Sequence, residues 1–130
     1  MKVIDGTNTV LGRLASYVAK ESLKGEEISI VNCGKIIITG NKSDIEQKQF
    51  SRRQRVGSGQ KGPKVSRSPQ MVVKRAIRGM VGDHRKGRGK EALKRVKCYG
   101  GIPSELESSK KITIEKTRKI KFTTIGEIAK

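Results

Sequence analysis

The residues with the clearest chemical purpose in this sequence are lysines and arginines, whose side chains bind phosphate groups. The segment from Arg52 to Lys97 holds 16 of them against two acidic residues, a net charge of +14 within a chain total of +18. Such a block of like charge repels itself in a compact protein and attracts a polyanion. Merely solvated surfaces usually mix both signs. The pattern therefore predicts a nucleic-acid partner.

Two glycine-rich stretches in this segment have the spacing of nucleotide-binding loops but not the surroundings. Residues 57–62 (GSGQKG) satisfy GxGxxG, yet a basic loop precedes them where a dinucleotide site needs an apolar strand, and Pro63 follows them. Residues 82–89 (GDHRKGRG) have the outer spacing of a phosphate loop, with Arg and Gly where Lys and Ser or Thr are required. Neither stretch predicts a cofactor, and we expect none.

Candidate catalytic and metal-binding groups are few. Asp5 ends the first apolar run, where open α/β sheets bind ligands, but no acid or base accompanies it, so we interpret it as a turn-capping residue. His84 is the only histidine, and exposure or a phosphate contact suits its basic loop. Cys33 and Cys98 lack CxxC spacing and are interpreted as reduced core residues. We expect no catalytic residue and no metal site.

The elements that would position the basic segment include four apolar, β-branched runs. Continuous apolarity is typical of strands buried on both faces of a sheet. The candidate strands are Lys2–Asp5, Glu26–Val31, Lys35–Thr39 and Val96–Tyr99. The second and third are adjacent strands joined by a short irregular crossing, one long bent strand, or a tight hairpin.

Helices alternate with these runs. Apolar spacing and flanking cap residues predict helices over residues 11–22, 43–50, 69–80 and 90–95, with a last helical turn at 124–127. The central helix follows Ser68 and Pro69, and it has an apolar face opposite its cations. In the 43–50 helix, Ile45 and Phe50 would face inward. With only four aromatic residues in the chain, we expect recognition of RNA backbone and shape rather than base stacking.

Length and composition indicate one domain over residues 1–130, with the basic RNA-binding segment at 52–97. There is no apolar run of about 18 residues for a membrane span and no secretory signal, so a cytosolic protein is expected. Two alternatives to a structural RNA-binding protein stay open at this point. One is an enzyme acting on RNA, such as a methyltransferase, and the other is a DNA-packaging protein.

Three stretches together resemble a known family. They are residues 11–16 (LGRLAS), 31–42 with its ITGNK end, and 88–103 (RGKEALKRVKCYGGIP) behind Arg78, Gly79 and Met80. The chain resembles the universal L13 family of large-subunit ribosomal proteins over nearly its full length. The resemblance implies an α/β fold with three layers (α/β/α) and a parallel four-stranded sheet of order 3-2-1-4. It also implies binding to large-subunit (23S-type) rRNA beside neighbouring ribosomal proteins, a part in early subunit assembly, and no enzymatic activity.

Departures from the bacterial pattern indicate an archaeal-type member. The chain has no Trp, Gly82 stands where bacterial members typically carry a proline, and Ile102–Ser104 replaces a His-Pro-His. We carry over the basic positions in matching segments, which are Arg13, Lys42, Arg78, Arg88, Lys90 and Arg95. Charge and loop context add Arg52, Arg53, Arg55, Lys61, Lys64, Arg67, Lys74, Arg75, Arg85, Lys86 and Lys94 as rRNA-binding residues.

Overall fold

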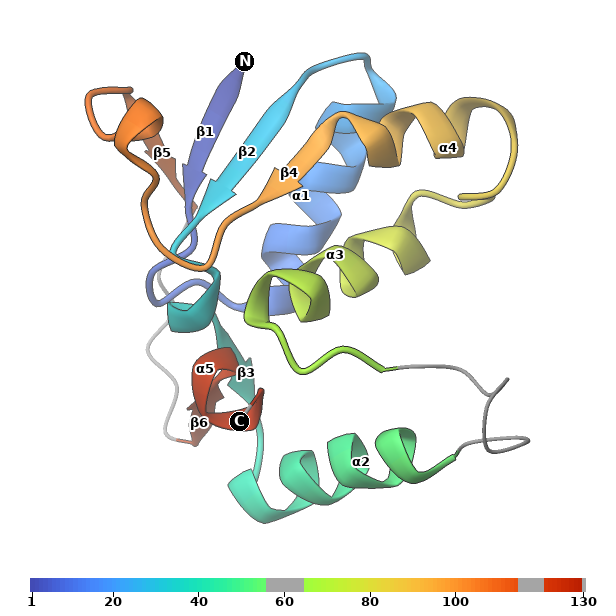
Figure 1. Ribbon diagram of the computed structural model, residues 1–130, viewed down its shortest axis with the longest axis vertical. Helices are drawn as coiled ribbons and strands as arrows, with labels where there is room; N and C mark the ends of the chain where they lie inside the picture. Colours follow the sequence, from blue (N-terminus) through green and yellow to red (C-terminus); the bar gives the residue numbers. More distant parts are fainter. Residues whose placement is uncertain (56–64, 115–120, 130) are drawn as a thin grey trace.

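The computed structural model describes residues 1–55, 65–114 and 121–129 (Figure 1). The elements in chain order are β1 (Lys2–Asp5), α1 (Leu11–Leu23), β2 (Ile28–Val31), the 3₁₀ turn η1 (Cys33–Lys35), β3 (Ile37–Thr39), α2 (Lys42–Gln54), α3 (Pro69–Met80), α4 (Gly87–Lys94), β4 (Val96–Cys98), η2 (Ser104–Leu106), β5 (Lys111–Thr113), β6 (Phe122–Thr124) and α5 (Ile125–Ile128). Residues 57–62, which have the GxGxxG spacing, lie outside the described residues together with Lys61 and Lys64. None of the helices in the described ranges is long and apolar enough to cross a bilayer.

Four strands form one parallel sheet in the order β4-β2-β1-β5. In chain order, β1, β2, β4 and β5 are the first, second, third and fourth strands of this sheet. The order across the sheet is therefore 3-2-1-4, as the family resemblance implies. The central strands align Ile4 with Ile30, and Ile30 in turn aligns with Cys98 of β4. Parallel strands need long crossovers, and helices supply them here. The α/β fold class is confirmed.

The strand predicted at 35–39 forms, but it does not belong to this sheet. Asn32 adopts a left-handed conformation (φ 58°) and η1 follows it, so the chain turns away after β2. β3 then pairs antiparallel with β6 in a separate two-stranded sheet. The fourth place in the main sheet is taken instead by β5, from the charged tail. The apolar residues of β3 had suggested a place in the main sheet. The backbone turn at Asn32 and η1 directs the strand into the second sheet instead.

The main core lies between the sheet and the helices α1, α3 and α4. It joins Ile4 and Ile30 of the sheet to Val18 of α1, Ile77 of α3 and Ala92 of α4. The opposite face is covered at η2, where Leu106 packs against Val3 and Val31. Burying these side chains supplies the main stabilising free energy, at about 25 cal/mol per Å² of apolar surface. The core therefore fixes α3 and α4, which carry the basic residues, against the sheet (Figure 1).

Helix α3 forms as its apolar spacing predicts. Ser68 is the N-cap and Pro69 the first helical residue. Val73 and Ile77 are fully buried, whereas Arg75 on the opposite face is exposed. One face of the helix packs and the other faces solvent.

Helix α2 differs from its prediction. It begins at Lys42, one residue before the predicted start, with Asn41 as N-cap, and runs beyond residue 50 to Gln54. No residue of α2 is buried, and Phe50, predicted to face inward, is 59% exposed. The sequence of α2 has too few apolar residues to bury a face. The helix consequently lies beside the body of the protein, below α3 in Figure 1.

Candidate nucleic-acid interface

Most of the basic residues predicted to bind RNA are on the surface. The exposed ones are Arg13, Lys42, Arg52, Arg55, Arg67, Arg75, Arg78, Arg85, Lys86, Arg88, Lys90 and Lys94. Three more, Arg53, Lys74 and Arg95, are half-buried. The two remaining lysines, Lys61 and Lys64, lie outside the described residues.

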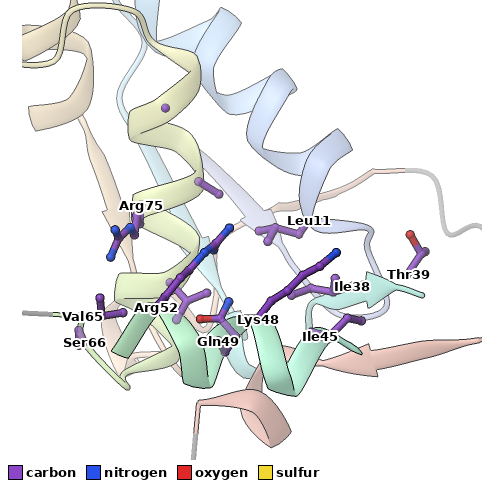
Figure 2. Close-up of a pocket in the computed structure, with 13 residues that line it drawn as sticks. Leu11, Ile38, Thr39, Ile45, Lys48, Gln49, Arg52, Val65, Ser66 and Arg75 are labelled. Carbon is purple, nitrogen blue, oxygen red and sulfur yellow. The ribbon is translucent and has the colours of Figure 1, made fainter. Parts of the chain in front are cut away.

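Nine of the fifteen described side chains are carried by the three helices α2, α3 and α4. In Figure 1, α3 lies between α4 and α2, so the cations of α3 connect two basic regions. At the α2 side, Lys48 and Arg52 share the lining of one pocket with Arg75 of α3 (Figure 2). The prediction from sequence named Arg52 and Arg75 but omitted Lys48. Its position on the α2 face toward α3 becomes evident only once the two helices are placed.

Two arginines carried over from the family also support the fold. The Nε and Nη2 atoms of Arg88 donate hydrogen bonds of 3.2 and 2.9 Å to the carbonyl oxygen of Leu23. Arg95 donates through Nη1 to the carbonyl oxygen of Ser22 at 3.3 Å. Both acceptors are in the last turn of α1, where carbonyls lack helical partners and positive charge is favoured. Arg88 and Arg95, the C-cap residue of α4, therefore join α4 to α1.

Helix α2 is attached at both of its ends to the carboxyl-terminal turn α5. Arg53 donates through Nη2 to the carbonyl oxygen of Ile128 at 3.0 Å. Lys42, at the other end of α2, lies 3.6 Å from the carboxylate of Glu127. These contacts position α2 although it buries no side chain. Lys42 and Arg53 thus combine a structural contact with a place in the predicted RNA surface.

The basic loop before α4 is shaped by its glycines. Gly82 and Gly87 have positive φ angles of 84° and 56°. The backbone N–H of Arg85 donates to the Asp83 carboxylate at 3.1 Å, and a Cβ at Gly89 would stand 2.2 Å from the Asp83 carbonyl oxygen. This close packing holds Arg85 and the lysine beside it outward in an ordered turn.

Asp5 caps a turn, as interpreted from the sequence. Its Oδ1 accepts hydrogen bonds from the backbone N–H and the hydroxyl of Thr7, at 3.0 and 2.7 Å. It also accepts one from Nδ2 of Asn32 at 3.1 Å. The adjacent Gly6 packs closely against Ile36, because a Cβ there would stand 2.6 Å from the side chain of Ile36. Asp5 stabilises the crossing from β1 to α1 and the left-handed residue after β2.

Cys33 and Cys98 are free thiols that share a hydrogen bond. This bond and burial raise the pKa of Cys33, which is fully buried. The same bond holds the pKa of Cys98 below its usual value, against the opposing effect of burial, and Lys74 contributes in the same direction. Within the ranges that the structure describes, no three or more His, Cys, Asp and Glu side chains gather as metal ligands.

Comparison with known proteins decides the family. The family described as Ribosomal protein L13 matches residues 1–105. The chain belongs to the ribosomal protein L13 family. L13 proteins are structural components and not enzymes, so the enzymatic alternative is excluded.

Relatives from archaea cover the same L13 chain almost end to end. A large ribosomal subunit protein uL13 from Methanococcus maripaludis is 43% identical over 132 residues, covering 99% of this chain and 95% of the relative. One from Methanocaldococcus jannaschii is 42% identical over 133 residues, covering 100% and 96%. One from Thermoplasma volcanium is 46% identical over 110 residues, covering 85% and 79%. The resemblance to an archaeal-type L13 protein is confirmed.

The L13 fold also exposes aromatic rings that sequence reasoning had discounted. Phe50 on α2 and Phe122 on β6 are 59% and 51% exposed. The inward placement of Phe50 was one ground for expecting no base stacking, and that ground is wrong. Phe50 stands between Gln49 and Ser51 in a helix with few apolar residues, and this polar setting was the available signal for its exposure.

Proposed function

We propose that this chain is a structural constituent of the large ribosomal subunit that binds folded large-subunit rRNA through the basic surface of α2, α3 and α4. The observation that carries the proposal is the exposure of twelve predicted RNA-binding cations on an L13 fold. Eight of these twelve side chains stand on helices, which are fixed by the core or by backbone contacts. They are therefore held ready for phosphate groups without first having to fold.

The chemistry of this surface is phosphate neutralisation. Each Lys or Arg that meets a phosphate releases condensed counterions, which favours binding and lets RNA helices approach one another. Arg75 and Arg78 on α3 lie between the cations of α2 and those of α4, so one protein can contact phosphates of more than one RNA segment. Such bridging stabilises rRNA tertiary structure and suits a part in early subunit assembly.

The remaining features of the proposal concern the setting of the protein. Residues 1–130 form a single ribosomal-protein domain in which residues 52–97 are the main RNA-binding segment. The partners are 23S-type rRNA and neighbouring large-subunit proteins, and the location is the cytoplasmic ribosome. No cofactor, membrane or small-molecule substrate takes part.

Sedimentation of a native lysate tests this function. We expect the chain, detected by mass spectrometry, to travel with the large subunit through a sucrose gradient and to stay there after a moderate salt wash. Finding it at the top of the gradient would overturn the proposal. A binding assay with duplex DNA separates the DNA-packaging alternative, which requires equal affinity for DNA and rRNA.

A further inference from the structure

The pocket between α2 and α3 has a volume of about 660 Å³, within the range of small-ligand sites. Its apolar lining includes Leu11 of α1, Ile45 of α2 and Val72 of α3, all of them half-buried. Figure 2 shows Leu11, Ile38 and Ile45 beside the side chain of Lys48. The helices therefore leave apolar surface open to solvent where a flat apolar group could cover it.

The cations of the pocket surround this apolar floor. Lys48 and Arg52 extend upward from α2, Arg75 stands on α3 (Figure 2), and all three line the pocket. No Asp or Glu is among the lining residues that the structure describes. Gln49 adds an amide that can both donate and accept hydrogen bonds. The pocket thus combines an apolar floor, one amide and an excess of positive charge.

We propose that the α2–α3 pocket takes one unpaired nucleotide of the bound RNA, an inference that rests on the proposed function and names what this part of the surface recognises. The base lies on the apolar floor and its edge meets Gln49. Its flanking phosphates pair with Arg52, Arg75 and Lys48. Unstacked RNA bases are commonly held in this way, on apolar or guanidinium surfaces with hydrogen bonds to their edges.

Charge complementarity favours RNA over a protein segment as the occupant. Three cations without a carboxylate would repel a basic peptide, and most of the chain's neighbours on rRNA must themselves be cationic to bind it. The pocket is also continuous with the exposed cations of the proposed interface through Arg52 and Arg75. A nucleotide can cover the apolar side chains with its base and pair its phosphates with the cations.

The test compares two short RNA hairpins that differ only in one unpaired adenosine. We expect the full chain to bind the bulged hairpin at least about fivefold more tightly than the fully paired hairpin at equal salt. Methyl NMR signals of Ile45 and Val72 should shift with the bulged hairpin and stay in place with inorganic phosphate. Repeating the comparison with a bulged uridine measures whether the pocket, through Gln49, binds adenine and uracil with different affinities.

Two variants separate the pocket from the general basic surface. Ala76→Leu narrows the pocket without changing charge, and we expect it to lose the preference for the bulge and to keep the affinity for the paired hairpin. Arg78→Ala, outside the lining, should weaken both hairpins alike. Circular dichroism checks that Ala76→Leu is folded, and the methyl shifts of the unmodified chain test the pocket without any variant.

Equal affinities for the two hairpins, with methyl signals unmoved, would overturn the inference. Salt-dependent binding of both hairpins would then leave the proposed rRNA function standing, and the pocket would be assigned to a segment of a neighbouring protein. Loss of binding to every RNA would instead contradict the proposed function itself.

Discussion

The guanidinium group of Arg88 closes the carboxyl end of α1 by donating two hydrogen bonds to the Leu23 carbonyl oxygen, at 2.9 and 3.2 Å. The two residues are 65 positions apart in the sequence. A residue that resemblance assigns to RNA binding therefore also holds α4 against α1. The distinction matters for any mutagenesis of the basic surface, because lost RNA binding at Arg88 can follow from lost stability.

Arg88→Ala should lower the free energy of unfolding by about 1 kcal/mol, since it removes two charge-assisted hydrogen bonds at an exposed site. Arg78→Ala, which removes an exposed cation from α3, should change stability by less than about 0.5 kcal/mol. Urea unfolding of both variants measures the difference. Equal stabilities would show that the Arg88 contact contributes nothing to the fold.

The pH dependence of stability should report on Glu21. Hydrogen bonds from Lys2 and Lys24 lower the pKa of the Glu21 carboxyl to about 2, from an ordinary value of 4.5. A carboxyl whose pKa is depressed by folding stabilises the protein above its unfolded pKa, and this contribution is lost as the pH falls through the folded value. The stabilisation by Glu21 should therefore be complete above pH 4.5 and decline toward pH 2.

Thermal melts of the unmodified chain and of Glu21→Gln at low salt test this effect. We expect the Tm difference between the two proteins to shrink as the pH is lowered from about 5 to about 3. Lys24→Gln, which removes only one of the two partners, should give a smaller difference. A Tm difference that stays constant with pH would argue against the ion pair.

Replacing either of two glycines by alanine should change the stability of the protein, in opposite directions. A Cβ at Gly89 would stand 2.2 Å from the carbonyl oxygen of Asp83, so Gly89→Ala should destabilise the protein by about 1–3 kcal/mol through overpacking. Gly12 in α1 has nothing within 4 Å of the same position, and Gly12→Ala should stabilise by about 0.5 kcal/mol. Urea unfolding measures both. A harmless Gly89→Ala would show that the turn at Asp83 can move.

The two thiols should differ in reactivity. Cys98 has a lowered thiol pKa and is partly exposed, whereas Cys33 is fully buried with a raised pKa. Because the thiolate is the reactive form, iodoacetamide should modify Cys98 first. Peptide mass spectrometry after a short reaction of the folded chain distinguishes the sites. Equal labelling in urea is the expected control, and preferential labelling of Cys33 in the folded chain would contradict the arrangement.

The sequence predicted much of this fold because apolar, β-branched runs mark β1, β2 and β4, and because Ser68 and Pro69 mark the start of α3. It misplaced β3 because the left-handed turn at Asn32 is a local backbone choice without an apolar signature. It missed the sheet position of β5 because this short strand alternates with charged residues, like an exposed tail.

The sequence predicted which types of residue make up the candidate site, but not most of the contacts that these residues make. Counting charges located the basic segment, and helical spacing put Arg75 on an exposed face of α3. The contacts of Arg88 and Arg95 with α1 join residues far apart in sequence, so no local pattern indicates them. The pocket that brings Lys48 to Arg75 depends in turn on how α2 is attached to α5.

The salt dependence of rRNA binding tests the central claim most directly. The affinity of the full chain for folded large-subunit rRNA should fall linearly on a plot of log affinity against log salt, by about 0.7–0.9 per phosphate contacted. Arg78→Ala should reduce that slope by about 1 without unfolding the chain. An affinity that does not change with salt, or a slope that Arg78→Ala leaves unaltered, would contradict phosphate binding by the basic surface of α2, α3 and α4.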